Sequence, residues 1–176
     1  MVKAYFVAGL AGSGKSYYSR KIAKELDLKI IDFDDNFNEF IKAHQDEFEK
    51  LGSEKFLANY ASTRYADLIN RAVIELTKGN SVVIAAPFSK QLQDQILWDE
   101  LILPIKKFDS NPTLYWVVIP DELRKKRLIT RGEKRDAEKI KKIDEYISFS
   151  PAKTPVVEHV LVQGDKGYEG QFRGNV

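Results

Sequence analysis

Short apolar runs alternate with longer segments of helical periodicity along the chain. Five runs rich in β-branched and aromatic residues predict strands, at residues 4–8, 28–33, 81–86, 113–119 and 156–162. Between these runs, apolar residues recur at the spacing of one helix face. This alternation is typical of βαβ units, in which helices cover both faces of a parallel sheet. The chain is therefore predicted to have a three-layer α/β/α fold.

The helical pattern is continuous over most of the connecting segments. Helices are predicted at residues 15–26, 36–50, 54–78, 90–101 and 121–131, with a further helix reaching about residue 147. The segment 36–50 is predicted to be one helix with an aromatic stripe, and Ser89 is expected to cap the helix at 90–101. No composition shift suggests a linker between two cores. We therefore expect one domain over residues 1–163, with an insert at about 36–60, a lid at about 121–140 and a loose tail at 164–176.

Composition narrows the functional classes. With 176 residues, 43% hydrophobic and 31% charged, the chain has the make-up of an ordinary soluble domain. The net charge of +2 gives no support to nucleic-acid binding, which stays possible. The absence of cysteine excludes thiol catalysis and cysteine-ligated metals, and His44 and His159 have no ligand spacing. No apolar run approaches the ~20 residues of a membrane helix, and the start does not resemble a signal peptide. A cytoplasmic protein without membrane contact is expected.

The segment from Gly9 to Ser16, GLAGSGKS, matches the pattern G-x-x-x-x-G-K-[ST] in full and lies between a predicted strand and a predicted helix. Glycines at these positions let successive N–H groups turn toward a phosphate, and the helix directs its positive end at the same anion. The lysine can reach the β- and γ-phosphates, and the final serine can bind Mg²⁺. The predicted ATP-binding residues in this region are Gly9, Ala11, Gly12, Ser13, Gly14, Lys15, Ser16 and Tyr17, with Ser16 also a metal ligand.

Three carboxylates, Asp32, Asp34 and Asp35, follow the second predicted strand. Ligands of open α/β sheets bind at the carboxyl edge of the strands, so these side chains are placed for chemistry. Asp34 is predicted to accept the proton of a substrate hydroxyl, and Asp32 is a candidate Mg²⁺ ligand. The alternative is that these residues only cap a helix. No acid ends the third strand, where many proteins with this loop carry one for Mg²⁺.

A basic segment follows the fourth predicted strand. Arg124, Arg127 and Arg131 share one helix face, because they are spaced at i, i+3 and i+7. Phosphoryl transfer needs cations over the migrating group, and Arg127 and Arg131 are the candidates for that role; Arg127 is also a candidate ATP ligand. The alternative is a solvated charged helix.

Taken together, the loop at 9–16, Asp34 and the stretch LRKKRLITRGEKRD at 123–136 resemble the small P-loop kinases of the adenylate-kinase-like group. The likeness is greatest to the AAA_33/zeta-toxin-like branch, which includes polynucleotide 5′-kinase domains and chloramphenicol phosphotransferase. The resemblance implies a P-loop NTPase sheet of order 2-3-1-4-5 with a helical lid, Asp34 as general base and lid arginines on the ATP phosphates. The D-x-D pair also looks like shikimate kinase, whose glycine triplet is replaced here by Ala85, Ala86 and Pro87.

These features predict an ATP- and Mg²⁺-dependent kinase that phosphorylates a hydroxyl of a small molecule or nucleotide. Lys15, Asp34, Arg127 and Arg131 are its predicted catalytic residues. Two alternatives stay open. One is an ATP-binding module without transfer activity, which the missing strand-three acid favours; the other is a shikimate-kinase-like enzyme or a nucleic-acid 5′-kinase.

Overall fold

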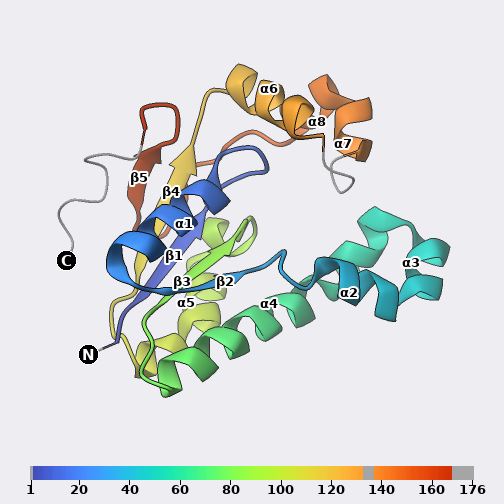
Figure 1. Ribbon diagram of the computed structural model, residues 1–176. Helices are drawn as coiled ribbons and strands as arrows, with labels where there is room; N and C mark the ends of the chain where they lie inside the picture. The colour runs from blue at the N-terminus through green and yellow to red at the C-terminus, as the bar shows by residue number, and fades with distance from the viewer. Residues whose placement is uncertain (1, 133–136, 168–176) are drawn as a thin grey trace.

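The computed structural model describes residues 2–132 and 137–167. A parallel sheet of order β2-β3-β1-β4-β5 forms its centre (Figure 1). The strands are β1 (Ala4–Ala8), β2 (Lys29–Asp32), β3 (Val82–Ala86), β4 (Thr113–Val118) and β5 (Val160–Gln163). The predicted fold class and strand order are therefore confirmed.

Helices cover both faces of this sheet. Helix α1 (Lys15–Leu26) lies on one face, and α4 (Ser53–Thr77) and α5 (Gln95–Ile102) lie on the other (Figure 1). Two short 3₁₀ turns flank α5, η1 (Gln91–Gln93) before it and η2 (Ile105–Lys107) after it. The result is the three-layer arrangement that alternating strands and helices predict.

The remaining helices form two projections from the sheet. Helices α2 (Phe37–Ala43) and α3 (Gln45–Leu51) pack with the start of α4, and α6 (Asp121–Arg131), α7 (Ala137–Lys141) and α8 (Ile143–Phe149) form the other group (Figure 1). The first group overlaps the predicted insert at about 36–60, and the second begins in the predicted lid at about 121–140 and ends at Phe149; the roles of insert and lid stay predictions. No helix in residues 2–132 or 137–167 is long and apolar enough to cross a membrane.

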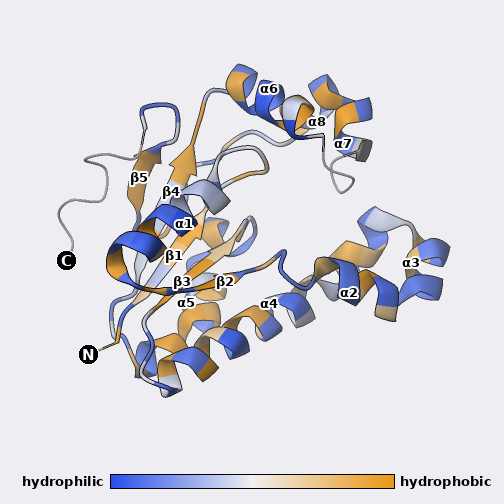
Figure 2. Cartoon of the chain, viewed as in Figure 1, coloured by the Kyte–Doolittle hydropathy of each residue, from blue (hydrophilic) through white to orange (hydrophobic). Residues whose placement is uncertain are grey.

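The core lies on the central strands. Every residue of β1 and β3 is buried, in keeping with the continuous apolar runs of strands that are covered on both faces (Figure 2). In the sheet register Ala8 lies opposite Ala86, and Asp32 lies opposite Ala85. The carboxyl ends of β1, β2 and β3 therefore meet at one edge, and this edge positions the loops that follow.

The segment 36–50 differs from its prediction as one helix. It forms two helices that meet at His44, whose ring nitrogen Nδ1 lies 3.0 Å from the carbonyl oxygen of Phe40. Phe40 and Phe48 would be about 12 Å apart along a straight helix. In the structure both rings contact Phe56, with centroid distances of 5.6 and 5.3 Å. Packing on one buried ring therefore explains the bend.

Two other predicted boundaries were wrong. Asp94, not Ser89, caps α5, because its carboxylate accepts hydrogen bonds from the N–H groups of Ile96 and Leu97 at 2.9 and 3.2 Å. The fifth strand begins at Val160 rather than at Val156. The N–H of Val156 instead donates to Leu92 O at 2.9 Å, which holds this segment against η1.

Candidate active site

The loop between β1 and α1 has the backbone of an anion-binding site. Gly12 and Gly14 have φ angles of 84° and 105°, which side-chain-bearing residues rarely adopt. Gly14 begins α1 and accepts hydrogen bonds from the next turn, so the positive end of that helix faces the loop. The Ser13 hydroxyl is buried and has no hydrogen-bond partner. A buried, unpaired polar atom inside a glycine cradle fits a phosphate-binding loop.

Lys15 and Ser16 open the helix beside this cradle. The ammonium of Lys15 lies 3.5 Å from the carbonyl oxygen of Leu10, on the far side of the loop. Its charge also acts on Asp32 at the end of β2, lowering the pKa of that carboxyl group against a larger effect of burial. Ser16 and Asp32 are thus the residues here that suit a hard cation. Within residues 2–132 and 137–167 no group of three or more His, Asp or Glu side chains is arranged around one point.

Helix α6 packs directly behind the loop. A Cβ atom on Gly12 would lie 3.0 Å from the Arg124 Cγ and 3.1 Å from the Leu128 Cγ. Arg127 donates from Nη1 to Ser13 O at 3.1 Å and from Nη2 to Gly164 O at 3.0 Å. The guanidinium therefore ties the loop to the turn after β5.

The acidic cluster forms a tight turn after β2. Oδ1 of Asp32 accepts from the N–H of Asp34 at 2.9 Å, and Oδ2 of Asp35 accepts from the N–H of Asp32 at 3.1 Å. Arg71 on α4 supports this turn by donating to Asp32 O at 3.0 Å. Burial raises the pKa of Asp32 above its usual value, and the charges of Asp34 and Asp35 raise it further. The carboxylates of Asp32 and Asp35 thus stabilise the turn that carries Asp34.

Comparison with known proteins agrees with this geometry. The AAA_33 family model, described as an AAA domain, matches residues 5–147. The chain belongs to the AAA_33 family. No curated protein sequence matches this AAA_33 protein.

Solved structures share the fold of this AAA_33 protein at low sequence identity. A sugar kinase from Janibacter sp. HTCC2649 is 14% identical with a TM-score of 0.59, over 94% of this chain and 87% of that one. A gluconokinase from Sinorhizobium meliloti 1021 is 12% identical with a TM-score of 0.51, over 92% and 82%. The YorR protein of Bacillus subtilis, solved with phosphorylated GDP, is 15% identical with a TM-score of 0.50, over 93% and 87%. This AAA_33 protein thus shares the overall fold of these three proteins.

Two α4 residues at the site were missed by sequence reasoning. Arg64 donates from Nη2 to Phe33 O at 2.9 Å, and its guanidinium carbon lies 3.9 Å from the Phe33 ring centroid. Burial lowers the pKa of Arg64, while the charge of Asp34 acts in the opposite direction. Tyr65 packs on the same Phe33 ring at 4.6 Å. Both residues lie some thirty positions after Asp34, in a long helix. Their sequence pattern indicates a helix and gives no sign of a contact with the acidic turn.

The predicted site residues of this AAA_33 protein lie in different parts of the structure. The loop residues Gly9 to Ser16 and the acidic turn meet at the shared edge of β1, β3 and β2. Both terminal nitrogens of Arg127 donate to main-chain carbonyls, and its role over the migrating phosphoryl group stays a prediction. Tyr17 contributes its main chain to the first turn of α1, while its ring is exposed. Arg131, at the end of α6, stays a predicted phosphate ligand.

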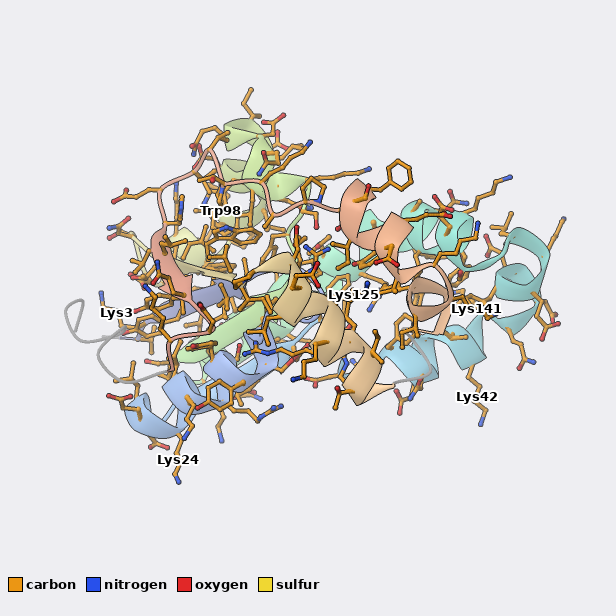
Figure 3. The ribbon with its side chains drawn as sticks, turned by 90° about the horizontal axis from the view of Figure 1, so that it is seen from above. Lys3, Lys24, Lys42, Trp98, Lys125 and Lys141 are labelled. Carbon is orange, nitrogen blue, oxygen red and sulfur yellow. The ribbon has the colours of Figure 1, made fainter. Side chains whose placement is uncertain are left out.

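The group formed by α6 and α8 is joined by charged and aromatic contacts. Lys125 on α6 pairs with Asp144 of α8 (Figure 3). Arg124, only 1% exposed, donates to Asp121 Oδ1 at 2.9 Å and to Ser150 O at 2.8 Å, and lies 5.8 Å from the Tyr146 ring. Arg124 thus connects the floor of the phosphate loop to the end of α8. Residues 133–136, in the middle of the predicted lid, lie outside the described residues.

The segment predicted to be a loose tail begins with residues that contact the site. The N–H of Gly164 donates to Val118 O at 2.8 Å, and the Tyr18 hydroxyl donates to Gly167 O at 3.1 Å. Residues 168–176 lie outside the described residues. Residues 164–167 therefore form a wall beside the loop.

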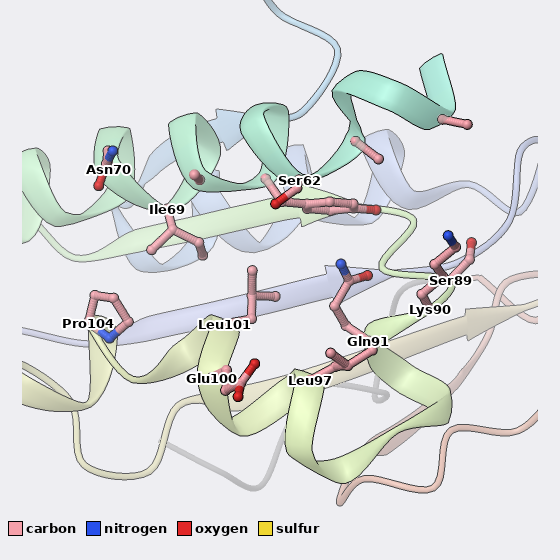
Figure 4. Close-up of a pocket in the computed structure, with 14 residues that line it drawn as sticks. Ser62, Ile69, Asn70, Ser89, Lys90, Gln91, Leu97, Glu100, Leu101 and Pro104 are labelled. Atoms are coloured by element: carbon pink, nitrogen blue, oxygen red, sulfur yellow. The ribbon is translucent and has the colours of Figure 1, made fainter. Parts of the chain in front are cut away.

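A cavity of about 690 Å³ lies away from the loop, between α4 and α5 (Figure 4). Ser89 and Lys90 border one end of it, and Pro104 borders the other. Small α4 side chains, Ala58, Ala61 and Ala66, leave this space open. Tyr65 lines the cavity as well, so one residue faces both this space and the acidic turn.

Proposed function

We propose that the protein is an ATP- and Mg²⁺-dependent phosphotransferase that moves the γ-phosphoryl group of ATP to a hydroxyl group of a small molecule or nucleotide. One observation carries the proposal: the phosphate loop and the Asp34 turn follow strands that flank β3 and end at the same edge. A triphosphate in the loop and a hydroxyl at Asp34 would then be neighbours. Transfer between bound groups requires this proximity. The reaction is expected in the cytoplasm, where ATP is supplied.

The residues divide the work of such a reaction. The loop N–H groups and Lys15 bind the β- and γ-phosphates, and Ser16 and Asp32 would hold Mg²⁺, whose charge offsets that of the triphosphate. Asp34 accepts the proton of the acceptor hydroxyl, and the oxygen of that hydroxyl bonds to the γ-phosphorus of ATP. The bond between the γ-phosphorus and the β,γ-bridging oxygen breaks at the same time, and ADP leaves. Arg131 supplies positive charge near the migrating group. Arg127 fixes the loop and, once released from Ser13 O, can add to that charge.

Arg64 points to the chemical class of the acceptor. It is half-buried beside Asp34, and within residues 2–132 and 137–167 no carboxylate lies within ion-pair distance of its guanidinium. A desolvated guanidinium with one carbonyl partner has donors left for a carboxylate or phosphate. We therefore expect acceptors in which an anionic group accompanies the hydroxyl. Arg64→Met should raise KM for such acceptors about tenfold or more, while the Kd of ATP stays the same.

A panel assay tests the proposal. ADP release from Mg·ATP is measured with polyols, sugars, hydroxy acids, nucleosides, nucleotides and oligonucleotides with a free 5′ hydroxyl. The expected result is acceptor-dependent turnover that falls about 100-fold or more in Asp34→Asn with unchanged ATP affinity. Asp35→Asn is the matched control, because the Asp35 carboxylate faces the Asp32 N–H and Arg71. Tight ATP binding without turnover on any acceptor would refute the kinase and favour the ATP-binding module.

Oligonucleotide acceptors have a separate signature. Binding of a nucleic acid through its phosphates weakens steeply as salt rises. Salt-insensitive or absent oligonucleotide binding would therefore remove the 5′-kinase from the candidates, while leaving small-molecule transfer in place.

A further inference from the structure

Phe88 has a backbone conformation that a bulky residue rarely adopts. Its φ angle is 50°, in the left-handed region, and its side chain is completely buried. Such a conformation is unfavourable for a residue with a side chain and persists only where its surroundings enforce it. Residues of this kind gather at functional sites. The strain therefore raises the question of what holds Phe88 and what the segment around it does.

Tyr65 holds this backbone. The N–H of Phe88 donates to the Tyr65 hydroxyl at 3.0 Å, and the two rings stack with a centroid distance of 5.5 Å and an interplanar angle of 28°. Burial raises the pKa of Tyr65 to about 12, so the hydroxyl stays neutral across the physiological range. Phe88 O accepts from Leu92 N at 2.9 Å, which fixes the other side of the residue.

The same tyrosine contacts the acidic turn. Its ring lies 4.6 Å from that of Phe33, the residue immediately before Asp34. Phe33 N donates to Ala85 O at 2.9 Å, so the turn starts directly beside the end of β3. Tyr65 thus connects the segment that carries the proposed base with the segment that follows β3.

The segment Pro87–Ser89 directly follows β3 at the edge where the site lies. Strand β3 lies between β1, which leads into the phosphate loop, and β2, which leads into the acidic turn. A residue directly after β3 therefore lies between a phosphate in the loop and a hydroxyl at Asp34. Pro87 is half-buried and Ser89 is exposed, whereas Phe88 is turned into the core. The left-handed turn at Phe88 places its ring in the core and leads from Pro87, at the end of β3, to Ser89, which borders the cavity between α4 and α5.

We propose that Tyr65 is a positioning residue for the transfer reaction. By holding the N–H of Phe88 and packing on Phe33, Tyr65 fixes the separation between the acceptor at Asp34 and the segment Pro87–Ser89, which follows β3. This inference rests on the proposed function, since it concerns the geometry of phosphoryl transfer. Its effect falls on the acceptor and not on the nucleotide, because Tyr65 contacts neither Gly9–Ser16 nor α6 among its hydrogen bonds and ring contacts in the described part of the chain.

The test is Tyr65→Phe, which removes one oxygen atom and keeps the ring. Tyr5→Phe is the matched control: Tyr5 is 6% exposed, lies in the core cluster on the α1 face, and its side chain makes no hydrogen bond within residues 2–132 and 137–167. Three quantities are measured on each protein. They are the exchange rate of the Phe88 amide by NMR, the Kd of Mg·ATP, and kcat and KM for the acceptor that the wild-type protein phosphorylates.

The expected result in Tyr65→Phe is faster exchange at Phe88 by about tenfold, a loss of about tenfold or more in kcat/KM for the acceptor, and an unchanged Kd for Mg·ATP. A merely structural tyrosine would lower all binding together or none. Wild-type acceptor kinetics in a variant whose Phe88 amide exchanges faster would overturn the inference, and so would unchanged exchange at Phe88. Failure of the proposed function is seen elsewhere, as an absence of transfer by the wild-type protein.

Discussion

Gly12 offers a direct test of how closely α6 packs against the phosphate loop. Its φ angle of 84° is matched by the 85° of Gly79, which follows α4. A Cβ on Gly12 would lie 3.0 Å from both Arg124 Cγ and Arg124 O, whereas a Cβ on Gly79 would have no neighbour within 4 Å. The two positions differ in crowding and not in backbone conformation.

Alanine at either position has the same local cost. In both variants the left-handed conformation of the alanine lowers the free energy of unfolding by about 1–2 kcal/mol. The reduced conformational entropy of the unfolded chain raises it by about 0.4–1 kcal/mol in both. Gly12→Ala must also displace a main-chain carbonyl on α6, and such overpacking costs about 1–3 kcal/mol. We therefore expect the free energy of unfolding to fall by about 1–3 kcal/mol more in Gly12→Ala than in Gly79→Ala.

Urea unfolding and nucleotide titration measure the two consequences. Gly12→Ala should also weaken Mg·ATP binding about tenfold, equivalent to 1.4 kcal/mol, because the displaced loop no longer directs its N–H groups at one point. Gly79→Ala should bind as the wild-type protein does. Equal losses of stability in the two variants would show that α6 does not press on the loop, and the account of Arg124 and Arg127 as its supports would then be wrong.

Two further changes have expected outcomes. Burial holds the pKa of Asp32 above 3.8, so the folded protein keeps this proton to higher pH than the unfolded chain, and the stability contributed by Asp32 falls as the pH rises. Without Mg²⁺, the melting temperature of Asp32→Asn should be higher than that of the wild-type protein at pH 7, and this difference should shrink as the pH falls toward 3.8. A difference in melting temperature that stays constant from pH 7 to 3.8 would contradict this. Arg124→Met removes the hydrogen-bond donor to Ser150 O, so the free energy of unfolding measured in urea should fall by about 1–3 kcal/mol and amide exchange in α8 should be faster. A variant as stable as the wild-type protein would show that this contact does not stabilise the fold.

The parts that sequence predicted share a local cause. The strands β1 and β3 are continuous apolar runs, and Gly9–Ser16 combines glycines, lysine and serine at a spacing that few other structures require. Each signal lies within a few neighbouring residues. The strands of the sheet and the phosphate loop could therefore be predicted from the sequence alone. The order of the strands came from the resemblance to P-loop kinases.

The parts that sequence missed depend on contacts across the chain. The bend at His44 arises because Phe40 and Phe48 both pack on Phe56, and no local signal marks it. Arg64 and Tyr65 look like ordinary helix residues, yet the first binds Phe33 O and the second holds Phe88 N.

Arg127 shows the limit of pattern reasoning in the other direction. Its spacing on a basic helix predicts a cation over the migrating phosphate, and no feature of the sequence indicates that Nη1 donates to Ser13 O and Nη2 to Gly164 O. The Gly164 partner lies 37 residues along the chain, in a segment whose composition suggested only a tail. Residue type and helix face can be predicted from sequence; the partner of a long side chain cannot.

The α2–α3 projection has an interior of its own. The rings of Phe40, Phe48, Phe56 and Tyr60 contact one another at centroid distances of 4.8 to 5.6 Å. These rings lie outside the core cluster beneath the sheet, and Arg64 links the two regions, 5.7 Å from the Phe40 ring and 3.9 Å from the Phe33 ring. Under the proposed function, exchange of this arm would change the surroundings of the acceptor while the phosphate loop between β1 and α1 stays as it is, so one scaffold would serve different acceptors.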